Sequence, residues 1–127
     1  MECRNEFGFR ASHLRPDQII HSSYRPMWLI AMFDLPVMTQ LSRKRASQFR
    51  HMLLDAGFIM LQFSIYARFC ESAEAVTVKR QYVRMNLPPD GAIRMIAITD
   101  RQFAKMEHYH GKKRARSEDP PDDLLLV

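Results

Sequence analysis

The stretch MWLIAMFDLP, residues 27–36, decides the fold of this chain. Its residues Met27–Phe33 are all apolar, too few to cross a membrane but the right number for a β-strand buried on both faces. The charge of Asp34 comes where that strand must leave the sheet, so rigid backbone holds a carboxylate that solvent can reach. Such a position suits a divalent metal ion or a cation bound to phosphate. The alternative is that Asp34 only starts a turn, as Asp before Leu-Pro commonly does.

Length and composition indicate a single globular domain. The chain has 127 residues, of which 46% are hydrophobic and 26% charged, and it contains no apolar run long enough to span a membrane. The start, Met1–Arg4, lacks the apolar segment of a secretory signal. Cys3 and Cys70 lie far apart, which indicates free thiols in a reducing compartment. We therefore expect a cytoplasmic protein.

The body of the chain is more basic than its formal net charge of +5 indicates. Four of the 14 acidic residues lie in the last ten positions, so residues 1–117 carry 19 Lys and Arg against ten Asp and Glu. This imbalance favours a polyanionic partner, most simply nucleic acid. A basic protein without such a partner is the alternative.

A helix is expected after Pro36, with Thr39 as its N-cap and Gly57 as its left-handed stop. Its apolar stripe comprises Phe49, Met52, Leu53 and Ala56, spaced at i, i+3, i+4 and i+7. The opposite face is cationic and is the candidate nucleic-acid surface, although such a row is often only a solvated face. The cationic residues are Arg43, Lys44, Arg45 and Arg50.

Residues 58–69 are β-prone and too long for one average strand, so we expect two antiparallel strands that turn near residues 61–63. The second strand alternates, which predicts a polar face able to meet phosphates or to line a solvent edge. That face consists of Ser64, Tyr66 and Arg68.

A second helix is expected after Ser72, followed by a turn at residues 88–91, a core strand at Ala92–Thr99 and a short helical turn at residues 100–105. The predicted inner face of this helix consists of Ala75, Val78, Tyr82 and Met85.

The resulting order predicts an α+β fold, the ferredoxin-like βαββαβ sandwich, over residues 27–110. Both helices would cover one face of an antiparallel sheet. Because both faces of the strand at residues 27–33 are apolar, a second copy is the natural cover for the other face, and we expect a homodimer. Residues 1–26 show no sustained period and are expected to be a flexible N-terminal extension.

Residues 111–127 are expected to form a linker and a further strand. Basic Gly111–Arg116 is followed by acidic Glu118–Asp123 and then by a purely apolar end. This end would add a strand to the edge of the partner protomer's sheet, or would dock on another protein. It comprises Leu124, Leu125, Leu126 and Val127.

Asp34 is the one well-placed candidate for a catalytic and metal-binding carboxylate, and one carboxylate cannot build a two-metal site. Dimer symmetry could bring two copies of Asp34 to one Mg²⁺, which needs only one or two carboxylates. His108 and His110 are candidate bases, but such a pair near a chain end is usually surface.

Several ordered blocks resemble one family: MWLIAMFDLPV, the basic residues 43–45 with Phe49 and Arg50, GFIMLQFSIYARF, and LPPDGAIRMIAITDRQF with Gly111. They resemble the small second universal CRISPR-associated protein, the dimeric partner of the CRISPR integrase, most closely its type II variants. Phe33 replaces the Tyr of many relatives, and residues 1–26 have no counterpart.

The resemblance implies a ferredoxin-like dimer whose C-terminal strands join the neighbouring sheet, a role in spacer acquisition, and divalent-metal-dependent nuclease activity on RNA or DNA. It makes Asp34 the metal-site aspartate and places Arg43, Lys44, Arg45, Arg50 and Arg68 in regions that meet the nucleic-acid backbone.

Three functions follow as hypotheses. A basic dimer could bridge integrase subunits and bind duplex DNA through its phosphates, without reading sequence. The chain could be a Mg²⁺-dependent endonuclease, or a ribonuclease toxin of the same fold that acts without an integrase. We favour the bridging role, with the nuclease as an additional activity.

Overall fold

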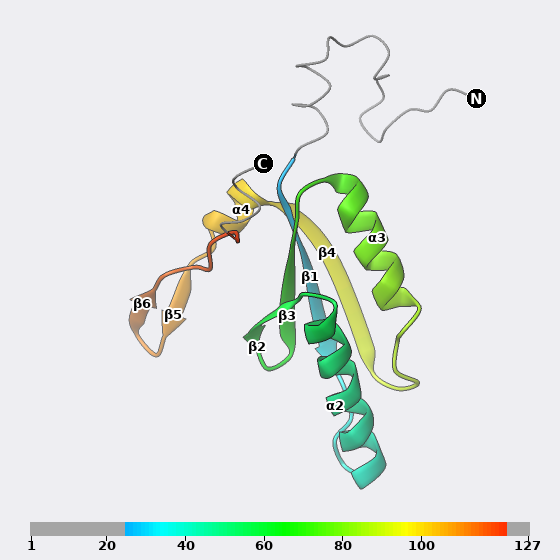
Figure 1. Cartoon of the computed structure of the whole chain (residues 1–127). Helices are drawn as coiled ribbons and strands as arrows, with labels where there is room; N and C mark the ends of the chain where they lie inside the picture. Colours follow the sequence, from blue (N-terminus) through cyan, green and yellow to red (C-terminus); the bar gives the residue numbers. More distant parts are fainter. Residues whose placement is uncertain (1–24, 122–127) are drawn as a thin grey trace, which may run out of the picture.

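The computed structural model describes residues 25–121, which form an antiparallel sheet covered on one face by two helices (Figure 1). The elements of the sandwich are β1 (Met27–Asp34), α2 (Gln40–Asp55), β2 (Ile59–Gln62), β3 (Ile65–Cys70), α3 (Ala73–Arg84) and β4 (Ala92–Thr99). The four strands lie in the order β2-β3-β1-β4. This is the ferredoxin-like βαββαβ arrangement, and the predicted α+β fold is confirmed.

Strand β1 is central because it pairs antiparallel with β3 on one side and with β4 on the other. Its side chains alternate between two apolar clusters, as strand geometry requires. Leu29, Ala31 and Phe33 face the helices, whereas Trp28 and Ile30 belong to the cluster on the opposite face. The prediction of a strand buried on both faces is confirmed.

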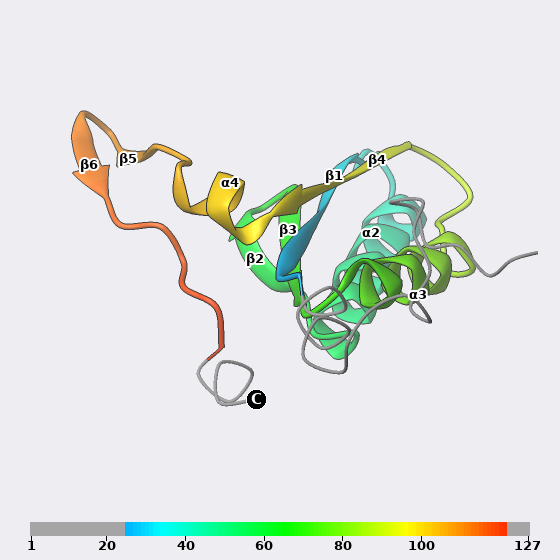
Figure 2. The same ribbon diagram turned by 90° about the horizontal axis from the view of Figure 1, so that it is seen from above.

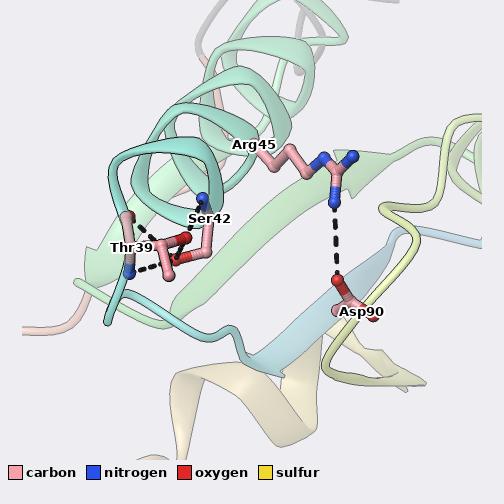
Figure 3. Close-up of polar contacts among 4 residues, drawn as sticks. All are labelled: Thr39, Ser42, Arg45 and Asp90. Carbon is pink, nitrogen blue, oxygen red and sulfur yellow. Dashed lines mark hydrogen bonds and ion pairs between the residues drawn. The ribbon is translucent and has the colours of Figure 1, made fainter.

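Helix α2 begins and ends where the sequence predicts. The Thr39 side chain accepts a hydrogen bond from the Ser42 amide at 3.0 Å, and the Ser42 hydroxyl in turn accepts one from the Thr39 amide at 2.9 Å (Figure 3). This reciprocal pair satisfies backbone donors that the helix itself leaves free. Phe49, Leu53 and Ala56 are buried, and Gly57 then reverses the chain with φ +89°.

The predicted polar face of the second strand is wrong, as the β2–β3 hairpin shows. The turn lies at Phe63-Ser64, and Tyr66 is only 2% exposed, with its ring 5.5 Å from that of Phe33 in the core. Because both faces of β3 are covered, polar side chains on alternate positions do not mark a solvent face. Ser64, Tyr66 and Arg68 therefore form no open polar set.

The predicted inner face of α3 is also wrong. Val78, Tyr82 and Met85 are 65%, 41% and 74% exposed, and the helix buries Ala73, Val76 and Val83 instead. Both sets have helical spacing, so periodicity alone does not choose between them. The core already holds the bulky side chains of Leu29, Phe33 and Tyr66, and the smaller residues of α3 pack against them.

The face of the sheet opposite α2 and α3 is partly covered by α4 (Asp100–Ala104), the predicted helical turn (Figure 2). The Phe103 ring stacks on Trp28 at 4.0 Å between centroids, and the Trp28 indole N–H donates to Asp100 at 2.7 Å. A hairpin of β5 (His108–His110) and β6 (Lys113–Ala115), which the sequence analysis did not predict, follows α4.

Two predicted segments fall largely or wholly outside the described residues. They are the N-terminal extension, of which the structure describes only residues 25 and 26, and the apolar strand at residues 124–127.

Within residues 25–121, no helix combines the length and apolar character that a membrane crossing requires.

Candidate nucleic-acid interface and acidic strand end

Asp34 is the last residue of β1, and its side chain is exposed. The backbone around it is held on both sides: Asp34 pairs with Ala92 of β4, and the Phe33 amide donates to the Ser64 carbonyl at 2.9 Å. Within residues 25–121 the Asp34 carboxylate makes no hydrogen bond or ion pair. The structure thus shows a carboxylate on rigid backbone, open to solvent, as the sequence predicts.

The turn at residues 88–91 packs directly on this strand end. Gly91 has φ +95°, and a Cβ built there would lie 2.7 Å from the Asp34 carbonyl oxygen and 2.7 Å from Cδ2 of Leu35. The neighbouring Asp90 forms an ion pair with Arg45 of α2 at 3.5 Å (Figure 3). The turn therefore links the cationic helix to the end of β1.

Replacing Gly91 with alanine is expected to destabilise the fold by about 1–3 kcal/mol, because the residue is held at positive φ and approaches backbone closely. Urea denaturation would measure the loss. Gly111→Ala is the matched control, since Gly111 also has positive φ (+61°) but nothing lies within 4 Å of its added Cβ. Equal losses in the two variants would show that the contact with Asp34 contributes nothing.

The cationic residues of α2 have different surroundings. Arg43 donates to the Val37 carbonyl at 3.1 Å, which keeps it beside the loop that follows Asp34. Lys44 is exposed, and Arg45 is held by Asp90. Arg43 and Arg45 thus contact segments beside the strand end, and the three residues do not form one uniform row.

Arg68 lies on the helix side of β3, away from these residues in sequence and half-buried. Its Nε donates to the Ala56 carbonyl at 3.1 Å, and its Nη1 donates to the Phe69 carbonyl. Gly57 provides the space for this side chain, because a Cβ at residue 57 would lie 2.7 Å from Arg68 Nε. Arg68 thus ties the end of α2 to β3, and a nucleic-acid role for it remains a prediction.

Arg50 contacts Phe63, an aromatic residue that the sequence analysis placed only at the expected turn near residues 61–63. Its guanidinium carbon lies 3.8 Å from the centroid of the Phe63 ring, and its Nε donates to the Phe63 carbonyl at 3.3 Å. The position of Phe63 within an expected turn was the available signal, since turn residues are exposed more often than strand residues.

The described residues of one protomer place no enclosing set of metal ligands around Asp34. Within residues 25–121, no group of three or more His, Cys, Asp or Glu side chains could enclose a cation. One exposed carboxylate still fits Mg²⁺, which retains several waters and takes one or two protein carboxylates.

The other candidate side chains do not join Asp34. His108 and His110 lie on the hairpin after α4, on the opposite face of the sheet from α2 (Figure 2), with ring centroids 4.8 Å apart. The Cys70 thiol is buried, and burial is the main cause that raises its pKa, so it stays protonated and is a poor nucleophile.

An antiparallel βαββαβ sandwich with a solvent-exposed aspartate at the end of a central strand defines a small ferredoxin-like α+β protein. The chain belongs to the family described as CRISPR associated protein Cas2, whose model matches residues 27–106.

Curated relatives agree with this family. A protein of Flavobacterium psychrophilum named CRISPR-associated endoribonuclease Cas2 is 47% identical over 105 residues, which cover 83% of this chain and 91% of the relative. Proteins of the same name from Paracidovorax avenae and Parvibaculum lavamentivorans are each 43% identical, over 105 and 100 residues. The matches cover 83% and 79% of this chain and 97% and 99% of those relatives.

Proposed function

We propose that this chain is a CRISPR adaptation subunit that bridges integrase subunits and binds duplex DNA during spacer acquisition. The main support for this proposal is that Arg43 and Arg45, near the start of α2, contact segments next to the exposed end of β1. The chain also belongs to a CRISPR-associated family. Membership in this family also argues against the ribonuclease toxin considered from the sequence.

Duplex binding would use phosphates rather than base edges. Arg43 and Lys44 are exposed cations at the start of a helix, where they can neutralise phosphates but present no ordered set of groups to a groove. Contacts of this kind give affinity and position without sequence information. This suits a subunit that must accept invading DNA of any sequence.

We propose a homodimer in which a second copy covers the open face of the sheet. Ile96 remains 50% exposed there, although it pairs with the buried Ile30. Beside these strands lies a groove of about 440 Å³, lined in part by Met32, Leu61 and Ile65 from the sheet. Exposed apolar side chains on one face of a small domain favour association, and a two-fold pairing uses the same surface on both copies.

A metal-dependent endonuclease activity is the second proposal, favoured by the names of the relatives and by the position of Asp34. Asp34 residues from the two protomers would hold a divalent cation, most simply Mg²⁺, which would supply Lewis-acid activation of the phosphodiester. Arg43 and Lys44 would hold the adjacent phosphates of the substrate. The relatives' names make RNA the favoured substrate for cleavage, with DNA as the alternative.

The bridging role is tested by adding this chain to a purified CRISPR integrase and a short duplex DNA. We expect the two proteins to co-purify and integration to require this chain. Sedimentation of this chain alone should give twice its mass of 15.0 kDa. Equal integration without this chain would overturn the bridging role, and a monomer would overturn the homodimer.

A further inference from the structure

A large aromatic side chain is exposed at the end of the sheet where Asp34 lies. Phe63 lies in the two-residue turn between β2 and β3 and is 68% exposed, whereas the neighbouring aromatics Phe33 and Tyr66 are buried. A phenylalanine in that position does not contribute to the core.

Arg50 supports one face of this ring. The guanidinium carbon lies 3.8 Å from the ring centroid, a cation–π contact, and the hydrogen bond from Nε to the Phe63 carbonyl fixes the turn to α2. Arg50 is also 5.8 Å from the buried Phe33 ring. The Phe63 ring is therefore held in place from one side and still exposes most of its surface.

The position of the ring relates it to Asp34. Ser64, the residue after Phe63, accepts a hydrogen bond from the amide of Phe33, the residue before Asp34. The turn and the acidic strand end thus lie at the same end of the sheet. Among the described residues, the Nη groups of Arg50 make no hydrogen bond, so they can still donate to a phosphate.

We propose that Phe63, supported by Arg50, is a stacking platform for an unpaired base of a nucleic acid whose backbone runs past Asp34. This rests on the proposed function, because it requires that the chain bind nucleic acid. Aromatic rings stack on any base, but bases inside a duplex are already stacked on each other. The ligand is therefore a single-stranded end or overhang, of either DNA or RNA.

The test compares Phe63→Leu with the parent chain on a blunt DNA duplex, on the same duplex with a short DNA or RNA overhang, and on an overhang that lacks its bases. Stacking of one base predicts that Phe63→Leu weakens binding of the overhang substrates by about 5- to 100-fold. Binding of the blunt and base-free substrates should not change. Phe63→Tyr should restore the preference, since it keeps the ring.

Tyr82→Leu is the matched control. Tyr82 is also an exposed aromatic beside a cation, with Lys79 Nζ 5.8 Å from its ring, but it lies on α3. The Tyr82→Leu variant should bind every substrate as the parent chain does. If Phe63→Leu and Tyr82→Leu have equal effects, Phe63 is not a specific platform.

A spectroscopic readout separates stacking from a structural role. In Phe63→Trp, an overhang should quench the emission of the new indole, whereas a base-free overhang should not. Binding of the blunt duplex without preference for an overhang and without quenching would reject the platform but leave the proposed function standing. If no nucleic acid binds at all, both proposals fall. A change of emission on dilution alone would show that a second copy covers Phe63, and would overturn the platform.

Discussion

The Asp34→Asn variant is expected to lose nucleolytic activity by at least about 100-fold, because even groups that only support metal ligands contribute 10- to 100-fold. Asparagine keeps the shape of the side chain but removes the charge that attracts a divalent cation. The Asp34 side chain makes no hydrogen bond or ion pair within residues 25–121, so the substitution should leave the unfolding free energy nearly unchanged. Cleavage assays with added Mg²⁺ measure the nucleolytic activity, and urea denaturation measures the unfolding free energy.

The same variant separates the two proposed roles. If the chain acts mainly as a bridge, Asp34→Asn should still support spacer integration while cleavage is lost. Loss of integration together with cleavage would instead make catalysis the physiological role. Asp55→Asn is a suitable control, because Asp55 is an exposed carboxylate at the far end of α2, and this variant should behave as the parent chain.

Reversing Arg43, Lys44 and Arg45 to glutamate together should abolish duplex DNA binding and flatten its dependence on salt. Each phosphate contact that is lost lowers the slope of log affinity against log salt by about 0.9. The effect should exceed that of simple neutralisation, because the carboxylate introduced in place of Arg45 would also face Asp90, the present partner of that arginine. Titrations of a fluorescent duplex at several salt concentrations provide the measurement.

The control for this variant carries the same change of charge on the other helix, with Lys79, Arg80 and Arg84 reversed to glutamate. A selective loss in the α2 variant would support the proposed interface. Equal weakening in both variants would show that binding follows net charge rather than the surface beside Asp34. Unchanged binding in the α2 variant would reject that surface altogether.

Sequence patterns predicted those parts of the molecule that depend on neighbouring residues. The apolar run before Asp34, the Thr39 cap, the Gly57 stop and the strand Ala92–Thr99 all occur where they were expected. Capping, positive φ and strand alternation act over a few residues, so the chain shows them directly. The exposed position of Asp34 followed from the same local reasoning.

The tertiary structure alone decided which partners distant residues acquire. Two stripes of α3 have helical spacing, and only packing against Phe33 and Tyr66 selects the one that contains Val76 and Val83. The ion pair of Arg45 with Asp90, the burial of Tyr66 and the contact of Arg50 with Phe63 join residues from different elements. No local period encodes such pairs, because they arise only when the sheet brings its strand ends together beside α2.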